Sequence, residues 1–104
     1  MKQQFDLLAK ELMERICSQI EEQDSEFEVE INFSNEVLTL EIGNKIYVIN
    51  KQSPLSEIWL ASPISGPYHF KLEDGRWVDS KNFDLFIILS DELSGLLNKK
   101  IVIS

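Results

Sequence analysis

Cysteine, histidine and positive charge are scarce in this 104-residue chain, which has one Cys, one His and ten Lys or Arg residues. The lone Cys17 excludes an intramolecular disulfide and any zinc site built from cysteine pairs, and it fits a reducing compartment. The lone His69 excludes a metal site made of several histidines. No hydrophobic run approaches the roughly 20 residues that a membrane-spanning helix needs. These absences predict a small domain that depends on its hydrophobic core.

Acidic residues outnumber basic ones by 18 to 10, which gives a formal net charge of −8 at pH 7. A phosphate backbone needs neutralising cations, and an anionic membrane surface attracts basic segments. We therefore expect neither nucleic acid nor a membrane as a partner. The negative electrostatic potential around such a chain favours a cationic partner: a metal ion, a basic protein surface or both.

We expect the chain to form one domain over residues 1–104. Its length lies in the usual range of about 100–200 residues per domain, and 43% hydrophobic with 27% charged residues is an ordinary globular composition. No repeat, low-complexity tract or linker divides it. The first residues lead directly into an amphipathic segment, without the apolar core of a signal peptide. We therefore expect the protein to stay in the compartment where it is made.

Hydrophobic periodicity predicts a helix, a run of strands and a second helix. In residues 4–22, apolar residues recur at three- and four-residue steps, as on one face of a helix. In residues 27–33 the period changes to two, with Phe27 among the residues expected to face the core. Further strands are predicted at residues 37–42, 45–51, 57–62, 68–72 and 76–79. Residues 83–98 predict a second helix, and the apolar tail at 101–103 is expected to lie back on the core.

This order of elements predicts an α+β fold. Strands that run together between two terminal helices indicate a two-layer α/β sandwich. We expect an antiparallel sheet of about six strands, with the N- and C-terminal helices packed on one face. The other face of the sheet would then be open to water or to a partner.

Sequence motifs of the common enzyme classes are missing. The chain has no GxxxxGK, GxGxxG, GxSxG or HExxH sequence. It also lacks the Glu-x-x-His pairs of di-iron helical bundles, since Gly66 stands three residues before His69. A lone strand histidine is more often a surface or cross-strand residue than a general base. From these patterns we expect that the protein is not an enzyme.

An acidic run between the first helix and the first strand is the strongest chemical signal. Its six carboxylates are Glu21, Glu22, Asp24, Glu26, Glu28 and Glu30. On a strand, Glu26, Glu28 and Glu30 would point to the same side, and their mutual repulsion would cost stability. One interpretation is a solvated face that keeps an edge strand from pairing with other chains. The other is a shallow, oxygen-only cation surface of modest affinity, because hard cations bind carboxylates and water.

A second candidate surface lies on the predicted strands. If Ile58 and Leu60 face the helices, Trp59 must face the open side of the sheet. The same alternation turns His69 outward, and Asn50 and Gln52 stand at the end of the third predicted strand. A solvated Trp among amides and an imidazole is typical of a protein-docking hot spot. The alternative is a Trp covered by a loop.

The sequence from Asn50 to Pro63, NKQSPLSEIWLASP, followed by SGPYHF at 65–70, resembles the frataxin family. It is similar to that family's signature, N-[KR]-Q-x-P-x-x-x-[IV]-W-L-[AS]. The resemblance covers nearly the whole chain, because the acidic end of the first helix, Trp77 and the closing helix fall in the expected order. The short N-terminus and the Tyr-His-Phe triplet at 68–70 resemble the bacterial branch.

The resemblance implies a cytoplasmic, non-enzymatic role in iron–sulfur cluster assembly. Family members bind iron (Fe2+ or Fe3+) weakly on an acidic ridge, which corresponds here to Glu21, Glu22, Asp24, Glu26, Glu28 and Glu30. They dock on the cysteine desulfurase, usually with the cluster scaffold protein, and regulate its output. The corresponding docking residues are Asn50, Gln52, Trp59 and His69.

Two further expectations come from the same resemblance. The family also carries a ferroxidase and iron-storage function, which is the alternative to the regulatory role. Weak ferroxidase activity would be compatible with a mainly regulatory, non-enzymatic protein. We expect a monomer, with iron-induced oligomers as the alternative state. One departure is that bacterial relatives often carry acids where this chain has Cys17 and Ser18.

Overall fold

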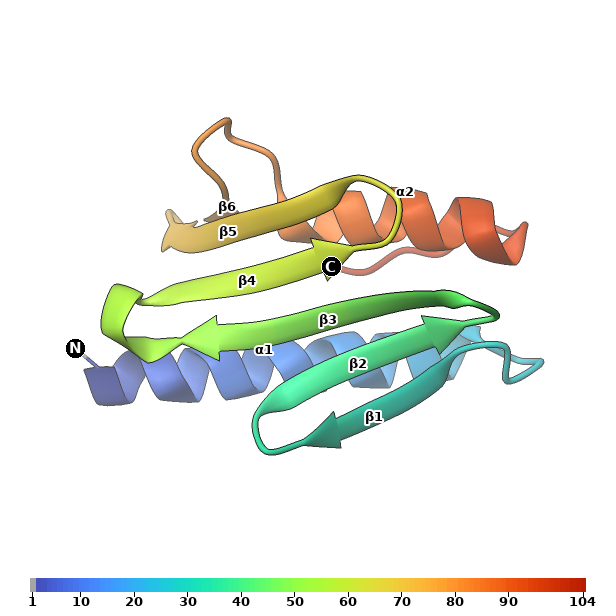
Figure 1. Cartoon of the computed structure of the whole chain (residues 1–104), viewed down its shortest axis with the longest axis horizontal. Coiled ribbons are helices and arrows are strands. Elements are labelled where there is room, and N and C mark those ends of the chain that lie inside the picture. The colour runs from blue at the N-terminus through green and yellow to red at the C-terminus, as the bar shows by residue number, and fades with distance from the viewer. Residues whose placement is uncertain (1) are drawn as a thin grey trace.

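The computed structural model describes the backbone of residues 2–104 and the side chains of residues 4–104. The elements in chain order are α1 (Lys2–Gln23), β1 (Glu30–Ser34), β2 (Val37–Ile42), β3 (Lys45–Gln52), the short 3-10 helix η1 (Ser53–Leu55), β4 (Glu57–Ser62), β5 (Gly66–Glu73), β6 (Arg76–Val78) and α2 (Leu85–Leu97). The strands form one antiparallel sheet in chain order, β1-β2-β3-β4-β5-β6 (Figure 1). The predicted six-stranded α+β sandwich is therefore confirmed.

Tight turns fix how neighbouring strands align. Asn35 and Glu36 connect β1 to β2, and both have positive φ, at 52° and 64°. Asp74 and Gly75 connect β5 to β6 in the same way, with φ of 51° and 78°. Two-residue turns with positive φ match the right-handed twist of the strands. They leave no freedom for the strands to slip, so the register across the sheet is well defined.

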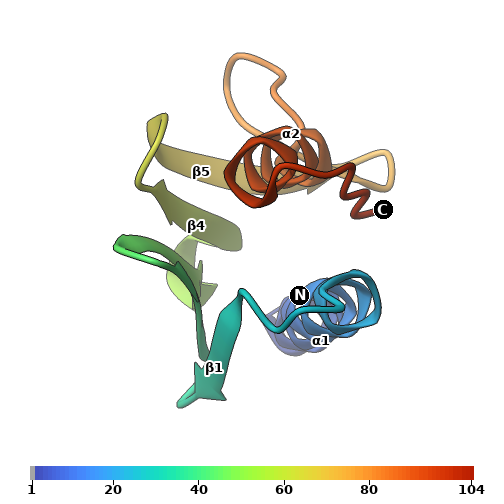
Figure 2. The same ribbon diagram turned by 90° about the vertical axis from the view of Figure 1, so that its right-hand side faces the viewer.

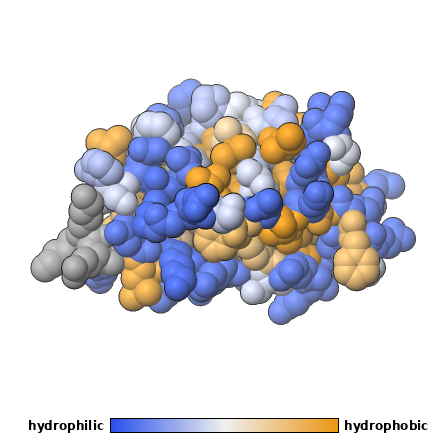
Figure 3. Space-filling view, turned by 60° about the horizontal axis from the view of Figure 1, so that its bottom comes forward, coloured by the Kyte–Doolittle hydropathy of each residue, from blue (hydrophilic) through white to orange (hydrophobic). Residues whose placement is uncertain are grey.

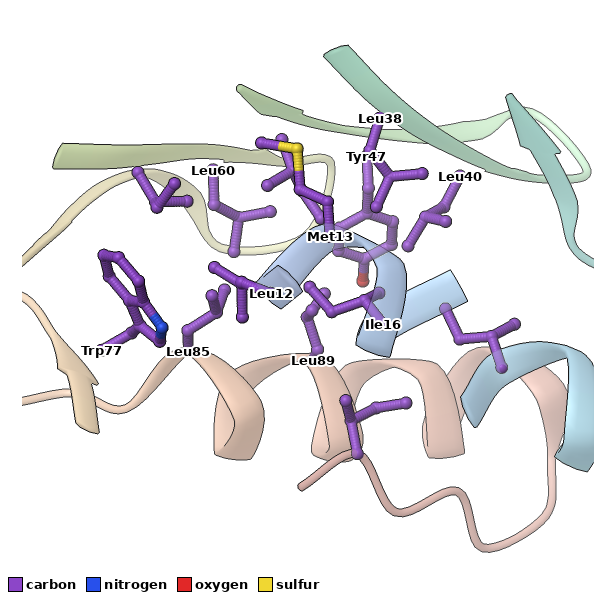
Figure 4. Close-up of a cluster of buried hydrophobic side chains, with 14 of the residues drawn as sticks. Leu12, Met13, Ile16, Leu38, Leu40, Tyr47, Leu60, Trp77, Leu85 and Leu89 are labelled. Carbon is purple, nitrogen blue, oxygen red and sulfur yellow. The ribbon is translucent and has the colours of Figure 1, made fainter. Parts of the chain in front are cut away.

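Both helices cover the same face of the sheet, as Figure 2 shows. Strand alternation sends Leu38 and Leu40 of β2, and Ile58 and Leu60 of β4, toward the helices, and none of these side chains is more than 1% exposed. The helices supply the other half of the core, which includes Leu12, Met13, Ile16, Leu85 and Leu89 (Figure 4). Burial of each such side chain contributes about 1.5–3 kcal/mol relative to exposure.

Helix α2 begins two residues later than the sequence predicts. The carboxylate of Asp84 accepts hydrogen bonds from the backbone N–H groups of Phe86 and Ile87, so Asp84 caps the helix. Phe83 thus lies before the helix and is half-exposed. The buried side chains of α2 recur every fourth residue and are Leu85, Leu89, Leu93 and Leu97.

The side chain of Glu92 links α2 to the sheet. The hydroxyl of Tyr47 in β3 donates to Glu92 Oε1 in α2 at 2.7 Å, and the hydroxyl of Ser62 in β4 donates to the same oxygen at 2.6 Å. Burial and the neighbouring Glu92 carboxylate raise the pKa of Tyr47 above its ordinary value. Tyr47 therefore stays a neutral hydrogen-bond donor. Its hydroxyl group is buried in the core but keeps a hydrogen-bond partner there, as buried polar groups usually do.

The C-terminal tail lies back on the core, as the sequence predicts. Ile101 and Ile103 are each 3% exposed, whereas Val102 between them is half-exposed. Figures 1 and 2 place this end of the chain between the two helices, on the side away from the sheet. No helix in the described part of the chain is long and apolar enough to cross a membrane.

Candidate functional site

The acidic segment, residues 21–30, leads from α1 to the edge of the sheet. Its five glutamates are all exposed and are Glu21, Glu22, Glu26, Glu28 and Glu30. The first two occupy the last turn of α1, the next two lie in the connecting loop, and the last begins β1. Hydrophilic residues cover most of the molecular face in Figure 3, around a group of hydrophobic residues near its middle.

Asp24 has a different role from its neighbours and does not belong to this exposed surface. It is only 5% exposed. Its Oδ1 accepts a hydrogen bond from the backbone N–H of Glu28 at 2.9 Å, and its Oδ2 accepts one from that of Val29 at 2.8 Å. Both oxygens are therefore used inside the protein. Asp24 thus holds the loop in place, and its burial sets it apart from the five exposed glutamates, whereas its predicted role as an iron ligand stays a prediction.

These hydrogen bonds also explain why the first strand is shorter than predicted. The loop that they close ends at Val29, so β1 begins only at Glu30. Phe27, expected in the core, has a left-handed φ of 55° and is 90% exposed. The prediction that Glu26, Glu28 and Glu30 form a row on one strand is wrong, because the backbone before Glu30 is a turn.

The structure adds a carboxylate that sequence reasoning missed. Glu30 of β1 lies directly opposite Glu41 of β2, and both side chains are exposed. Directly opposed residues have Cβ atoms about 4.5–5.5 Å apart, and like charges there destabilise a sheet. The sequence could have indicated this pair, because a two-residue turn at Asn35 and Glu36 fixes which residues of the two strands lie opposite each other.

The carboxylates do not form a preorganised chelating site. Among the side chains that the structure describes, no three Asp, Glu, His or Cys residues lie close enough together to hold a metal ion. Cys17 is half-buried at the edge of the core, and burial together with the nearby Glu21 raises the pKa of its thiol. The raised pKa favours the neutral thiol over the thiolate form that binds metals. The surface can attract hard cations, but it does not enclose one.

The second candidate surface is assembled by strand register. Asn50 of β3 lies opposite Trp59 of β4, and Trp59 lies opposite His69 of β5. We call these three residues the Trp59 row. The indole and imidazole rings are stacked, with centroids 4.1 Å apart and an interplanar angle of 9°. Because Ile58 and Leu60 are buried under the helices, the row lies on the open face of the sheet.

The predicted outward direction of Trp59 is confirmed, but exposure differs along the row. His69 is exposed, but Trp59 is half-buried because its ring is covered by the stacked imidazole. Gln52 lies two residues beyond Asn50 on the same strand face and pairs with Glu57. The structure therefore brings all four predicted docking residues together in one patch.

Glu57 orients this patch, and sequence reasoning missed it. The indole Nε1 of Trp59 donates a hydrogen bond to Glu57 Oε1 at 2.8 Å. Nδ1 of His69 lies 4.0 Å from the same oxygen, and Nζ of Lys71 lies 3.9 Å from Oε2. The signal is the two-residue spacing between Glu57 and Trp59, which places both on one face of β4.

The Trp59 row lies on the open face of the sheet, and of the acidic segment only Glu30 belongs to a strand. Ser34 belongs to the cross-strand line that runs through Val37 and Asn50 to Trp59. Glu30 is therefore four residues along and three strands across from Trp59. With strand geometry of ~3.4 Å per residue and ~4.8 Å per strand, the backbone positions of Glu30 and Trp59 lie roughly 20 Å apart.

A six-stranded antiparallel sheet with two terminal helices on one face, an acidic edge and a tryptophan on its open face defines a frataxin-type α+β sandwich. The chain belongs to the frataxin family: a frataxin-like domain matches residues 1–99. It is similar to the iron–sulfur cluster assembly proteins CyaY of Shewanella sp. strains ANA-3 and MR-4. Each is 46% identical over 85 residues, which covers 76% of this chain and 74% of the relative.

Solved structures share the fold. Frataxin from Psychromonas ingrahamii superposes with a TM-score of 0.88 at 27% identity, and the match covers 99% of this chain and 97% of that one. A trimeric frataxin from Saccharomyces cerevisiae, complexed with ferrous iron, superposes with a TM-score of 0.79 at 38% identity over 88% of this chain and 86% of its own.

Proposed function

We propose that this protein is an iron-binding adaptor and regulator of iron–sulfur cluster assembly in the bacterial cytoplasm and is not itself an enzyme. The observation that carries the proposal is the Trp59 row, in which an amide, an indole and an imidazole lie in register, with the two rings stacked, on the sheet face that neither α1 nor α2 covers. The names of the Shewanella relatives support the pathway.

Iron is the cargo in this proposal, and the exposed glutamates of the acidic segment attract it. Glu21 and Glu22 lie at the C-terminal end of α1, where the helix dipole also favours a cation. Carboxylates and water suit Fe2+ and Fe3+, and an open surface leaves much of the ion's water shell in place. We therefore propose weak binding by Glu21, Glu22, Glu26, Glu28 and Glu30, with Glu41 opposite Glu30 as an added contributor.

The proposed partner is the cysteine desulfurase in complex with the scaffold protein. Asn50, Gln52, Trp59 and His69 form the docking patch, with the Trp59 indole as its anchor. A large aromatic side chain held by neighbours loses little conformational freedom on binding, which is why such residues dominate interfaces. The protein itself would act as a monomer in this complex.

Binding titrations with the desulfurase, with and without the scaffold protein, test this function. Trp59→Ala should weaken docking by about 2 kcal/mol or more, a typical hot-spot loss. The matched control is Ile46→Ala, which removes another exposed apolar side chain from the same open face. A Trp59→Ala variant that binds as tightly as the Ile46→Ala control would refute docking through the Trp59 row.

A ferroxidase and iron store is the second candidate, because the yeast relative complexed with ferrous iron is a trimer. Aerobic mixing with ferrous iron, followed against an iron-only blank, measures oxidation, and sedimentation of the same samples measures assembly. The adaptor proposal predicts a rate close to the blank and a monomer. Rapid oxidation coupled to a larger assembly would favour storage instead.

A further inference from the structure

The outer edge of β5 is paired over only part of its length. Strand β6 is three residues long, and its pairing with β5 stops at Lys71 and Val78. Residues 66–70 of β5 pair with β4 on their other side and have no strand on this one. After β6 the chain enters the loop 79–84, which projects beyond the edge of the sheet (Figure 1). A stretch of strand edge is therefore left open beside this loop.

Strand register shows which backbone groups this edge offers. The two-residue turn between β5 and β6 makes Glu73 and Arg76 a hydrogen-bonded pair. Hydrogen-bonding direction alternates along a strand, so the N–H and carbonyl of His69 point to the same side as those of Glu73, past the end of β6. The stacking of Trp59 on His69 agrees, because side chains approach most closely at pairs without hydrogen bonds. His69 thus offers one donor and one acceptor at the edge.

The loop 79–84 does not use these groups, because it folds on itself around Asp79. The N–H of Asp79 donates to the Phe83 carbonyl at 3.0 Å, and the N–H of Asn82 donates to the Asp79 carbonyl at 2.9 Å. The Asp79 carboxylate accepts from the N–H groups of Lys81 and Phe83 at 3.0 and 2.8 Å. No backbone hydrogen bond within residues 2–104 joins the loop to His69. The loop is therefore a self-contained wall beside an open strand edge.

A cleft of about 830 Å³ lies between this edge and the loop. His69 and Glu57 line it from the docking patch, so the cleft continues the Trp59 row. Tyr68 and Phe83 line it as an aromatic pair with ring centroids 6.4 Å apart, and Phe83 is 50% exposed. The cleft thus combines free backbone groups with an apolar contact surface, which are the two features of a site for an extended peptide.

Charge does not decide what this cleft binds. Lysines 71 and 81 and glutamates 57 and 73 line it together with Asp79, so the two signs nearly balance. Two of the three carboxylates already have partners, because Glu57 accepts from the Trp59 indole and Asp79 from its own loop. Recognition here therefore depends on the backbone and the aromatic pair.

We propose that the cleft takes up an extended segment of the same protein that docks on the Trp59 row, which rests on the docking function proposed above. The segment pairs with the backbone of His69 as a short added strand. Its residue opposite His69 lies on the open face and continues the row. The residues on either side of it point the other way, toward Tyr68 and Phe83, and are apolar.

A second copy of this chain is a poor occupant of the same edge. Each copy carries a net charge of −8, so two copies repel each other. Pro67, the next residue of β5 whose backbone faces outward, has no N–H to donate. Proline at an edge limits pairing to a short stretch and discourages strand-to-strand association of copies. A partner segment that pairs only with His69 is not affected by this restriction.

Amide hydrogen exchange in the unmodified chain tests the pairing, with the desulfurase–scaffold complex as the probe. In the free chain the amide of His69 should exchange at least about tenfold faster than that of Phe70, which points toward β4. Excess complex should slow the exchange of His69 at least about tenfold. A His69 amide that is already slow in the dilute free chain overturns the proposal. Slowing that appears only as the chain's own concentration rises assigns the edge to a second copy and also overturns it.

The same titrations separate this inference from the proposed function. Absence of any docking overturns both. Docking that Trp59→Ala weakens, but that leaves the exchange of His69 unchanged, overturns only the added strand and keeps the Trp59 row as the interface.

A pair of variants tests the aromatic side of the cleft. Phe83→Ala should weaken docking at least about fivefold, the loss expected for a contact residue of an interface. Ile87→Ala is the control, because Ile87 is also exposed, at 57%, but does not line the cleft. It should change the affinity less than about twofold. Melting temperatures show that both variants are folded in the assay. Equal affinities of the two folded variants would mean that the partner does not enter the cleft.

Discussion

The Trp59 row and the acidic segment are both polar surfaces of one small domain, but different interactions place their side chains. Strand register holds Asn50, Trp59 and His69 side by side, so each side chain has a fixed neighbour. The glutamates of the acidic segment lie on a helix end, a loop and a strand end, where the buried carboxylate of Asp24 is the main organising contact. The first surface therefore presents side chains in a fixed arrangement, whereas the second presents mainly negative charge.

Asp24→Ala should have the largest effect on this comparison. It removes the acceptor of two backbone N–H groups and should lower the free energy of unfolding by about 2–4 kcal/mol, since hydrogen bonds to charged groups are worth more than neutral ones. Chemical denaturation measures the change. Glu22→Ala, on the exposed end of α1, is the control and should stay within about 0.5 kcal/mol of the parent. Similar losses in both variants would mean that Asp24 is no different from its acidic neighbours.

Glu57→Ala tests whether the Trp59 row is held in place before docking. Loss of the hydrogen bond from the Trp59 indole leaves the ring free to leave its stack on His69. Docking to the desulfurase should weaken by about 1 kcal/mol, the usual value of one hydrogen bond. Glu57→Gln keeps an acceptor and should restore most of the affinity. A Gln variant as weak as the Ala variant would show that the charge of Glu57, rather than its orientation of Trp59, supports docking.

Glu41→Lys tests the repulsion at the edge of the sheet. It converts the Glu30–Glu41 like-charge pair into an opposite-charge pair and should stabilise the protein by about 0.5 kcal/mol at low salt. Glu41→Gln should give a smaller gain. Both gains should shrink as salt is added, because screening also relieves the repulsion in the parent. Thermal melts at two salt concentrations measure this, and a destabilised Lys variant would contradict the expectation of repulsion.

The sequence predicts the Trp59 row well because two local rules are sufficient there. Alternation turns Trp59 away from Ile58 and Leu60, and short turns bring His69 beside it. The same alternation rule failed at Phe27, which is 90% exposed. A single buried carboxylate, Asp24, ends the strand pattern there through hydrogen bonds four and five residues along the chain. Hydrophobic periodicity carries no information about such a contact.

The coupling between iron and docking should be the smallest effect of all. Across roughly 20 Å of water, two unit charges interact by only about 0.2 kcal/mol. The Debye length is about 8 Å at physiological salt, so screening removes most of even that. If the desulfurase contacts only the Trp59 row, ferrous iron should change its affinity less than about twofold, and salt should abolish the change. Anaerobic titrations with and without iron at two salt concentrations measure the coupling. A change of tenfold or more would mean that the interface extends to the acidic segment, where iron and partner would contact the same glutamates.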